Sequence, residues 1–353
     1  MISEVVKMSC YSRRLRQTEP EQQNGGSGPR HVSTHSRVNG WSLPLHPFQL
    51  VAWLFYSYLA VVGFGIYVPL LPHGWKHAAY VVIGLLFVGH LVTHLVAITV
   101  DPADPSVLAK KSYSRPMPAF DRTKHKHVIQ NLHCYLCEAD VGPRAKHCSA
   151  CNKCIADFDH HCKWLNNCVG GKNYWFFFCA VGSAVLGVLL LTMVVLYVFI
   201  QYFVNPADLR TDPQFERVTS NTTWFVFLPA APVETTPAGI LAIAILTVML
   251  GVAPILLLGH LLVFHLYLLW KRLSTYDYMV HQRNTQSIRE RKNIEEAQVT
   301  SDGTLADIVS TPRESDLPLS DRSSGLRYHD GGLISLGQPD GICTDVADTT
   351  SLA

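Results

Sequence analysis

Cysteine and histidine, the side chains best suited to metal binding and thiol chemistry, are concentrated in the middle of this sequence. Seven of the ten cysteines lie within 35 residues: Cys134, Cys137, Cys148, Cys151, Cys154, Cys162 and Cys168. Two Cys-x2-Cys pairs followed by further Cys and His residues at short intervals are typical of tetrahedral zinc sites. From His133 to Cys168 the segment holds eleven Cys or His residues; two closed zinc sites use eight, so three remain for another role.

The run Asp159-His160-His161-Cys162 supplies a carboxylate, two imidazoles and a thiol within four residues. A carboxylate orients an imidazole, the imidazole takes the proton of a thiol, and the resulting thiolate attacks a carbonyl carbon. A structural zinc site needs no extra thiol, so the run predicts nucleophilic chemistry. The spacing alone leaves open which histidine binds metal and which acts as the base.

Long stretches without charge flank this segment on both sides. Asp, Glu, Lys and Arg make up 16% of the 353 residues, against about 25% in soluble proteins. Four stretches of at least 23 residues contain none of them: 48–71, 78–100, 174–204 and 238–270. A helix of about 20 apolar residues crosses a bilayer and satisfies its own backbone groups there. The sequence therefore predicts an all-α polytopic membrane protein with four transmembrane helices, and it excludes a soluble globular enzyme.

Lys and Arg indicate which side of the membrane each loop faces, because positively charged loops stay in the cytosol. Of 29 such residues, 26 lie before residue 48, within 101–173 or after residue 270, which predicts that both termini and this loop are cytosolic. The sequon Asn221-Thr222-Thr223 falls in the loop 205–237, which is predicted to be lumenal. Because the cytosol is reducing, we expect the cysteines to bind metal or react as thiols rather than form disulfides.

The two ends of the chain are rich in polar residues and lack a helical apolar repeat, which predicts disorder. The polar stretch before the first span is too long to be a cleaved signal. We expect these parts: a disordered cytosolic segment at 1–47, transmembrane helices 1 and 2 at 48–100, a small cytosolic zinc domain at 101–173, transmembrane helices 3 and 4 at 174–270 with the lumenal loop 205–237, and a mostly disordered cytosolic tail at 271–353.

The cysteine-rich segment also contains a long gapped motif: Cys134-x2-Cys137, Pro143-Arg144-Ala145-Lys146-His147-Cys148-x2-Cys151-x2-Cys154, Asp159-His160-His161-Cys162, Trp164, Asn167-Cys168-Val169-Gly170 and Asn173. This motif closely resembles the cysteine-rich domain of the DHHC protein S-acyltransferases (palmitoyltransferases). The four-span topology, with this loop in the cytosol, extends the resemblance to about residues 48–280.

The resemblance implies a role for each residue. One structural zinc ion is held by Cys134, Cys137, His147 and Cys154, and a second by Cys148, Cys151, His161 and Cys168. Cys162 is the nucleophile, His160 its base and Asp159 the residue that orients His160. Cys162 takes palmitate from palmitoyl-CoA as a thioester and passes it to cytosolic cysteines of membrane-associated proteins. The resemblance also implies an endomembrane location, in the endoplasmic reticulum, Golgi or endosome, and no nucleic-acid partner.

Contacts with acyl-CoA are expected near the nucleophile. Trp164 and Lys163 are candidates, and Trp164 and the aromatic group Phe176–Phe178 either line the acyl entrance or anchor the chain at the membrane interface. A basic cluster before the domain either meets the CoA phosphates or attracts anionic lipid: Lys110, Lys111, Arg115, Arg122, Lys124 and Lys126.

The sequence departs from the family pattern at several positions. Lys163 follows the nucleophile where most members have Pro, a feature of one subset of the family. The Asp-Pro-Gly motif reads Asp101-Pro102-Ala103, and the Thr-Thr-x-Glu motif after the fourth span reads Ser274-Thr275-Tyr276-Asp277. The aromatic and Asn motif usual in the C-terminal segment is not recognisable.

Two alternatives to an acyltransferase follow from the sequence. Lys163 and the missing C-terminal motif are compatible with a zinc-stabilised membrane scaffold that acylates weakly or not at all. The intramembrane histidines His90, His94, His260 and His265 raise the possibility of a metal, haem or proton transporter. Polar pairing within the helix bundle, or a position near the cytosolic interface, explains these histidines without transport.

Overall fold

The computed structural model describes residues 35–110, 117–118, 120–218, 220 and 222–309. Several predicted features lie outside the described residues: the N-terminal segment up to residue 34, the basic residues Lys111 and Arg115, the sequon residue Asn221 and the chain after residue 309.

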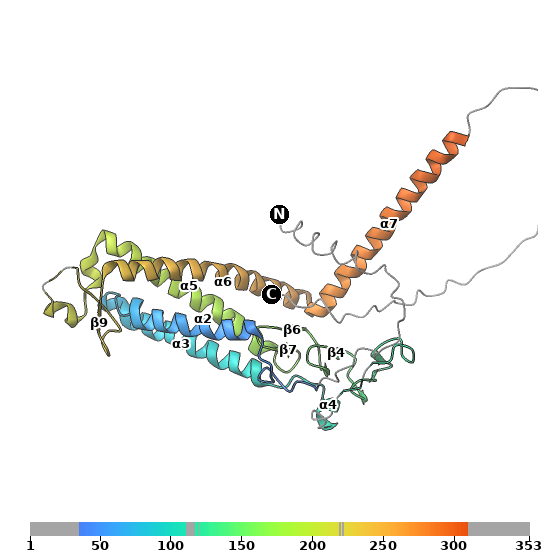
Figure 1. Ribbon diagram of the computed structural model, residues 1–353, viewed down its shortest axis with the longest axis horizontal. Helices are drawn as coiled ribbons and strands as arrows, with labels where there is room; N and C mark the ends of the chain where they lie inside the picture. Colours follow the sequence, from blue (N-terminus) through green and yellow to red (C-terminus); the bar gives the residue numbers. More distant parts are fainter. Residues whose placement is uncertain (1–34, 111–116, 119, 219, 221, 310–353) are drawn as a thin grey trace, which may run out of the picture. The chain divides into compact units, whose positions relative to one another are not determined.

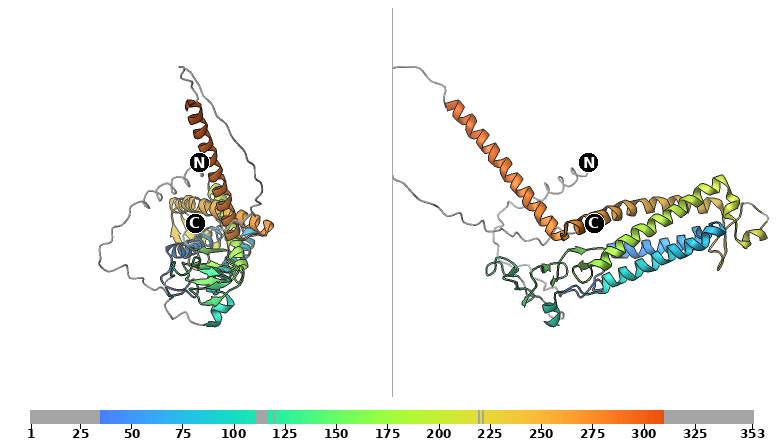
Figure 2. Two further views of the ribbon diagram at one scale, coloured as in Figure 1. Left: turned by 90° about the vertical axis from the view of Figure 1, so that its right-hand side faces the viewer. Right: turned by 180° about the vertical axis from the view of Figure 1, so that it is seen from behind.

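Four helices are long and apolar enough to cross a membrane, which confirms the predicted polytopic α-helical fold. They are α2 (Pro47–Val62) with its π-helical extension η1 (Gly63–Tyr67), α3 (His73–Thr99), α5 (Tyr174–Val204) and α6 (Pro237–Lys271). Figures 1 and 2 show them side by side, with α5 next to both α3 and α6. Helix α3 begins five residues before the predicted stretch and includes Lys76, which is buried.

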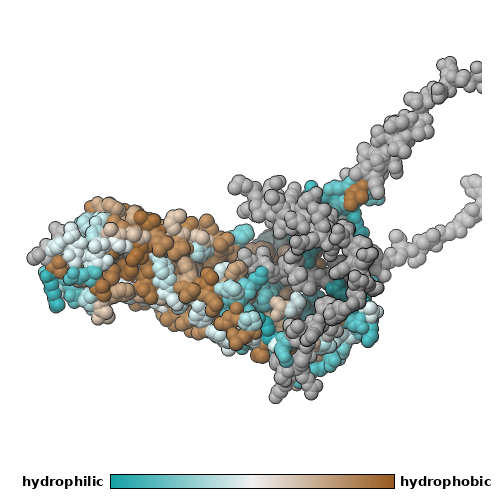
Figure 3. All heavy atoms as spheres, viewed as in Figure 1, coloured by the Kyte–Doolittle hydropathy of each residue, from teal (hydrophilic) through white to brown (hydrophobic). Residues whose placement is uncertain are grey.

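The outer surface of these helices is apolar, as expected for a face in contact with lipid. Leu54, Leu85 and Leu257 are 71%, 69% and 69% exposed, whereas large exposed apolar patches are uncommon on soluble monomers. Brown, hydrophobic side chains cover the helix bundle on the face shown in Figure 3. Within the bundle, His90 Nδ1 pairs with the Ala180 carbonyl oxygen at 3.0 Å, so this histidine joins α3 to α5.

The loop between α5 and α6 folds against one end of the bundle. It contains η2 (Pro206–Leu209), η3 (Pro213–Arg217) and a hairpin of β8 (Trp224–Val226) and β9 (Val233–Thr235). The Phe227 N–H donates to the Gly65 carbonyl oxygen at 2.5 Å, and a Cβ added at Gly65 would lie 2.6 Å from the Phe227 ring. Glycine is therefore required where the loop meets the π-helical turn.

At the opposite end, the segment between α3 and α5 forms the cysteine-rich domain from one short helix and three small antiparallel sheets. The elements are α4 (Pro105–Lys110), β1 (Ile129–Gln130), β2 (His133–Cys134), β3 (Ala139–Asp140), β4 (Lys146–Cys148), β5 (Lys153–Ile155), β6 (His160–Cys162) and β7 (Asn167–Val169). With two or three residues per strand, these sheets bury little apolar surface, so other bonds must stabilise the domain.

Two further segments contact this domain. Residues 35–46 run along it: the Arg37 N–H donates to the Cys151 carbonyl oxygen at 2.9 Å, and the buried Lys153 ammonium donates to both Val38 O and Asp101 Oδ1. Helix α7 (Thr275–Val309) follows α6 after a short turn. The Ser274 hydroxyl accepts a hydrogen bond from the Asp277 N–H at 3.1 Å, which is the usual arrangement of an N-cap.

Candidate functional site

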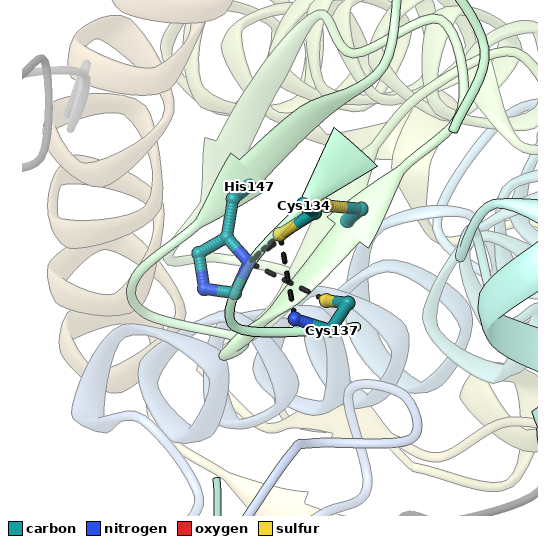
Figure 4. Close-up of side chains that lie close together, drawn as sticks. Cys134, Cys137 and His147 are labelled. Atoms are coloured by element: carbon teal, nitrogen blue, oxygen red, sulfur yellow. Dashed lines mark hydrogen bonds between the residues drawn. The ribbon is translucent and has the colours of Figure 1, made fainter. Parts of the chain in front are cut away.

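One set of cysteines and histidine comes together where β2, β4 and β5 meet. The Sγ atoms of Cys134, Cys137 and Cys154 lie 3.7, 3.5 and 3.8 Å from His147 Nδ1. Figure 4 shows the first two side chains and His147 pointing toward one another. The Cys137 N–H also donates to Cys134 Sγ at 3.4 Å, which closes the tight turn between these two cysteines.

The second set lies between the β4-β5 turn and the β6-β7 hairpin. Cys148, Cys151 and Cys168 place their Sγ atoms 3.8, 3.4 and 3.5 Å from His161 Nδ1. The donor atoms of each set all lie within 4.8 Å of one another. The structure thus brings together the same two sets of four that the family resemblance implies.

The spacing within both sets fits a zinc ion. With Zn–S bonds of about 2.3 Å and Zn–N bonds of about 2.0 Å, a tetrahedral ion separates N and S ligand atoms by about 3.5 Å. The six separations measured from the two histidines range from 3.4 to 3.8 Å. Three thiolates and one imidazole are a donor set that zinc prefers.

Strand alternation explains how neighbouring residues serve different sites. Successive side chains of a strand point to opposite faces, so His147 and its neighbour Cys148 in β4 belong to different sets. Antiparallel pairing places His147 opposite Cys154, and in the next hairpin it places His161 opposite Cys168. The same alternation in β6 separates His161 from His160 and Cys162. In the structure His161, rather than His160, therefore lies with Cys148, Cys151 and Cys168.

His160, Cys162 and Asp159 form a buried polar constellation beside the second set. Asp159 and His160 are 4% and 6% exposed, and Cys162 is 7% exposed. Asp159 Oδ2 lies 2.7 Å from His160 Nδ1, and His160 and Cys162 line the same cavity. Because Nδ1 is engaged by Asp159, the other ring nitrogen of His160 is left for the thiol.

The electrostatics of this constellation favour a proton on His160. Burial opposes the charged imidazolium, but the Asp159 carboxylate, bonded to the ring, and the nearby Cys162 thiol outweigh it and raise the pKa of His160 to about 9. Burial also opposes the charged form of Asp159. Its hydrogen bonds with His160 and Thr275 outweigh burial and hold the pKa of Asp159 below its ordinary value. The pair is therefore suited to accept the proton that a reacting thiol releases.

Helix α7 supplies a second hydrogen bond to the carboxylate. The Thr275 N–H, in the first turn of α7, donates to Asp159 Oδ1 at 2.9 Å, and Thr275 is fully buried. The partial positive charge of a helix N-terminus also stabilises a carboxylate there. The motif beginning at Ser274 thus acts on a residue 116 positions away in the sequence.

A cavity opens onto the thiol at the end of the helix bundle. It is lined by His160, Cys162, Trp164, Phe177, Leu261, His265 and Thr275. Trp164 stacks on Phe48 with ring centroids 5.0 Å apart, and it remains 36% exposed. Of the aromatic group Phe176–Phe178, Phe177 reaches the cavity, whereas Phe176 is 41% exposed. Lys163 is half-buried in the β6-β7 turn.

Two asparagines join the domain to the helices. The Asn167 amide donates to the carbonyl oxygens of Ala97, Ile98 and Val100 at 3.0 to 3.2 Å, at the C-terminal end of α3. The Asn173 amide donates to Ala97 O at 3.2 Å and to Cys168 O at 2.9 Å. Both asparagines are fully buried, so they fix the β6-β7 hairpin against the membrane helices.

Sequence reasoning missed three contributions to this site. It recorded Thr275 within a motif but did not connect it to Asp159, and it considered His265 for transport, polar pairing or an interfacial position but not beside the thiol. It also did not anticipate that Lys153 pairs with Asp101, at 2.5 Å. The motifs that begin at Asp101 and Ser274 could have indicated that these residues matter, but a motif does not show which residues it contacts.

Comparison with known proteins agrees with this geometry. Residues 127–282 match the family model described as DHHC palmitoyltransferase. The chain is 52% identical to palmitoyltransferase ZDHHC11 of Danio rerio over 98% of its own length and 80% of the relative's. It is 58% identical to palmitoyltransferase ZDHHC1 of Mus musculus, over 77% of this chain and 56% of that protein. It is also 54% identical to palmitoyltransferase ZDHHC1 of Homo sapiens, over 81% and 60%.

The chain therefore spans little more than half the length of the two mammalian ZDHHC1 relatives and four fifths of the zebrafish ZDHHC11 protein. All three relatives are more than 50% identical to this chain over most of its length. The family match covers both metal-binding sets and the Asp159-His160-Cys162 constellation. The chain belongs to the DHHC palmitoyltransferase family.

Proposed function

We propose that this chain is a protein S-palmitoyltransferase that works by a ping-pong mechanism through a thioester on Cys162. The observation that carries the proposal is the buried Asp159-His160-Cys162 constellation, which opens into a cavity at the end of four membrane-spanning helices. Membership of the family supports this activity over a scaffold without it.

In the first half-reaction, His160 takes the proton of the Cys162 thiol. The thiolate attacks the thioester carbonyl carbon of palmitoyl-CoA, the bond to the CoA sulfur breaks, and the departing CoA thiolate takes the proton from His160. Asp159 holds Nδ1 of His160, so the ring keeps the other nitrogen toward the thiol and its transient positive charge is balanced.

In the second half-reaction, a cysteine of a substrate protein attacks the palmitoyl-Cys162 thioester. His160 takes the proton of the incoming thiol and returns a proton to Cys162 as the bond to it breaks. The thioester on Cys162 is exchanged for a thioester on the substrate cysteine, and the Cys162 thiol is regenerated. Substrate cysteines must reach the end of the helix bundle, so we infer that the substrates are membrane-associated proteins with cytosolic cysteines.

Each of the two Cys3His sets would hold a structural zinc ion. One set is Cys134, Cys137, His147 and Cys154; the other is Cys148, Cys151, His161 and Cys168. Four protein ligands leave no open position, so zinc would supply cross-links rather than chemistry. The short strands make such cross-links necessary, and β6 carries a ligand of the second set next to both His160 and Cys162.

The acyl chain would lie in the apolar part of the cavity, near Phe177 and Leu261, with its thioester at Cys162. Trp164 and Lys163 would face the CoA side, since Trp164 is partly exposed and Lys163 carries the charge that phosphates attract. The distribution of Lys and Arg supports cytosolic termini and a cytosolic zinc domain. By family resemblance the location is an endomembrane: the endoplasmic reticulum, Golgi or endosome.

The test is intact mass and peptide mapping of the detergent-purified chain after incubation with palmitoyl-CoA, beside the variant Cys162→Ser. We expect a hydroxylamine-labile palmitoyl group on Cys162 that the variant lacks. The exposed Cys179 gives a matched control, because Cys179→Ser should acylate as the wild type does. A folded, zinc-loaded wild type without palmitate on Cys162 would overturn the proposal in favour of the scaffold.

A further inference from the structure

His265 and Tyr174 form a hydrogen-bonded pair on the membrane side of the catalytic constellation. We propose that this pair positions the His160 ring from the side of α5 and α6, as Asp159 does from within the domain. The proposal rests on the proposed function, in which His160 is the base for Cys162. It makes His265 and Tyr174 positioning residues of the acyl-transfer reaction.

The burial of His265 calls for a polar partner. It lies in the last two turns of α6 and is 2% exposed, and a polar ring in such surroundings is costly unless it is hydrogen-bonded. Its Nδ1 atom lies 3.3 Å from the hydroxyl oxygen of Tyr174, the first residue of α5. This bond connects the two membrane helices beside the cavity.

The rings of His160, Phe177 and His265 pack against one another. Phe177 meets His160 and His265 edge to face, with centroids 5.0 Å from each, and the centroids of His160 and His265 are 5.8 Å apart. The His160 ring cannot tilt toward α5 or α6 without displacing at least one of the other two. The hydrogen bond with Asp159 restrains one ring nitrogen but leaves this tilt free.

Polar atoms of Asp159, His160 and His265 also lie within 4.8 Å of one another. A metal ion at these three residues would compete with bonds already present, because both carboxylate oxygens of Asp159 are occupied, one by His160 and one by the Thr275 N–H. The geometry therefore favours positioning of the base. Because a displacement of about 1 Å costs up to 100-fold in rate, a contact that limits ring tilt has a measurable effect.

The test uses the purified full chain in detergent and measures the single-turnover rate of Cys162 palmitoylation over a range of palmitoyl-CoA concentrations. His265→Phe keeps a ring but removes the nitrogen partner, and Tyr174→Phe removes only the hydroxyl. We expect each to lower the maximal rate about 5- to 30-fold, by misplacing the base, with the half-saturating palmitoyl-CoA concentration within about twofold of wild type. The double variant should be no slower than the slower single variant, because both changes remove the same bond.

Exposed residues on α6 provide matched controls. His260→Phe and Tyr267→Phe make the same chemical changes at exposed positions of α6, away from the cavity, and should leave the rate unchanged. His265→Asn, whose amide oxygen can accept a hydrogen bond from the Tyr174 hydroxyl, should recover part of the rate lost in His265→Phe.

Three outcomes would overturn the proposal. One is a wild-type rate in His265→Phe, the second is single-variant losses that multiply in the double variant, and the third is loss of zinc in either variant, which would show a merely structural role. Failure of the proposed function is distinguishable, because then the wild type itself would carry no palmitate on Cys162.

Discussion

Replacing Thr275 by proline removes one hydrogen bond of the Asp159 carboxylate and spares the helix that supplies it. Thr275 follows the N-cap Ser274 and is the first residue of α7, where proline is well tolerated because its missing N–H has no partner within the helix. Among the described residues, the hydrogen bond that this N–H donates goes to the side-chain oxygen Asp159 Oδ1, at 2.9 Å.

The size of the effect follows from the burial and charge of this bond. Thr275 is fully buried and Asp159 is 4% exposed, and a hydrogen bond to a charged group contributes about 1.5 to 3 kcal/mol. If the whole contribution is realised in the transition state, the rate falls about 10- to 150-fold. Asp159 keeps its 2.7 Å bond to His160, so we expect the lower end, about 10-fold.

The assay is single-turnover palmitoylation of Cys162 in Thr275→Pro, with Thr275→Val as the matched variant that keeps the N–H. Zinc content and thermal midpoint should match the wild type in both, which shows that the fold persists. We expect Thr275→Val to be clearly faster than Thr275→Pro. Equal rates in the two variants would refute the reasoning, because the backbone bond would then contribute nothing to the reaction.

The remaining predictions concern the metal sites, the residue after the nucleophile and the intramembrane histidines. Cys148→Ala should release zinc and unfold the domain, whereas Cys162→Ser should keep about two zinc ions per chain; equal zinc loss in both, measured by atomic emission, would show that ligands and nucleophile are wrongly divided. Lys163→Pro should change the rate of self-acylation at least about twofold, because it removes a cation next to the nucleophile and fixes the turn; an unchanged rate would make this position irrelevant. Replacing His90 and His94 together by Leu should leave acylation and metal content unaltered, and a drop in either would revive a transport role.

The membrane helices were the most predictable part of the fold. Lipid excludes charge, so the charge-free stretches mark the spans directly, and α5 has the predicted bounds. The start of α3 was harder to locate, because Lys76 ends the charge-free stretch although it lies inside the helix and is buried. Helix α7, which follows the fourth span, was not predictable from periodicity, because its sequence shows no helical apolar repeat.

The metal-binding sets show where local spacing is sufficient and where it is not. Cys-x2-Cys pairs form within one turn, so Cys134 with Cys137 and Cys148 with Cys151 were recognisable from spacing alone. The division of His160 from His161 needed the strand of β6, whose three residues are too few for an alternation to be detected. Contacts between distant segments, such as Thr275 with Asp159 and His265 with Tyr174, left no pattern in the sequence.

The bond from Thr275 to Asp159 has a consequence for the order of events on the ribosome. The residues of the cysteine-rich domain are synthesised before the third and fourth spans, and residue 275 follows them all. A nascent chain can therefore assemble the domain and its thiol while the carboxylate still lacks its second partner. The site that we propose is complete only after residue 275 has been made, so we expect acylation to begin only once all four membrane-spanning helices have been synthesised.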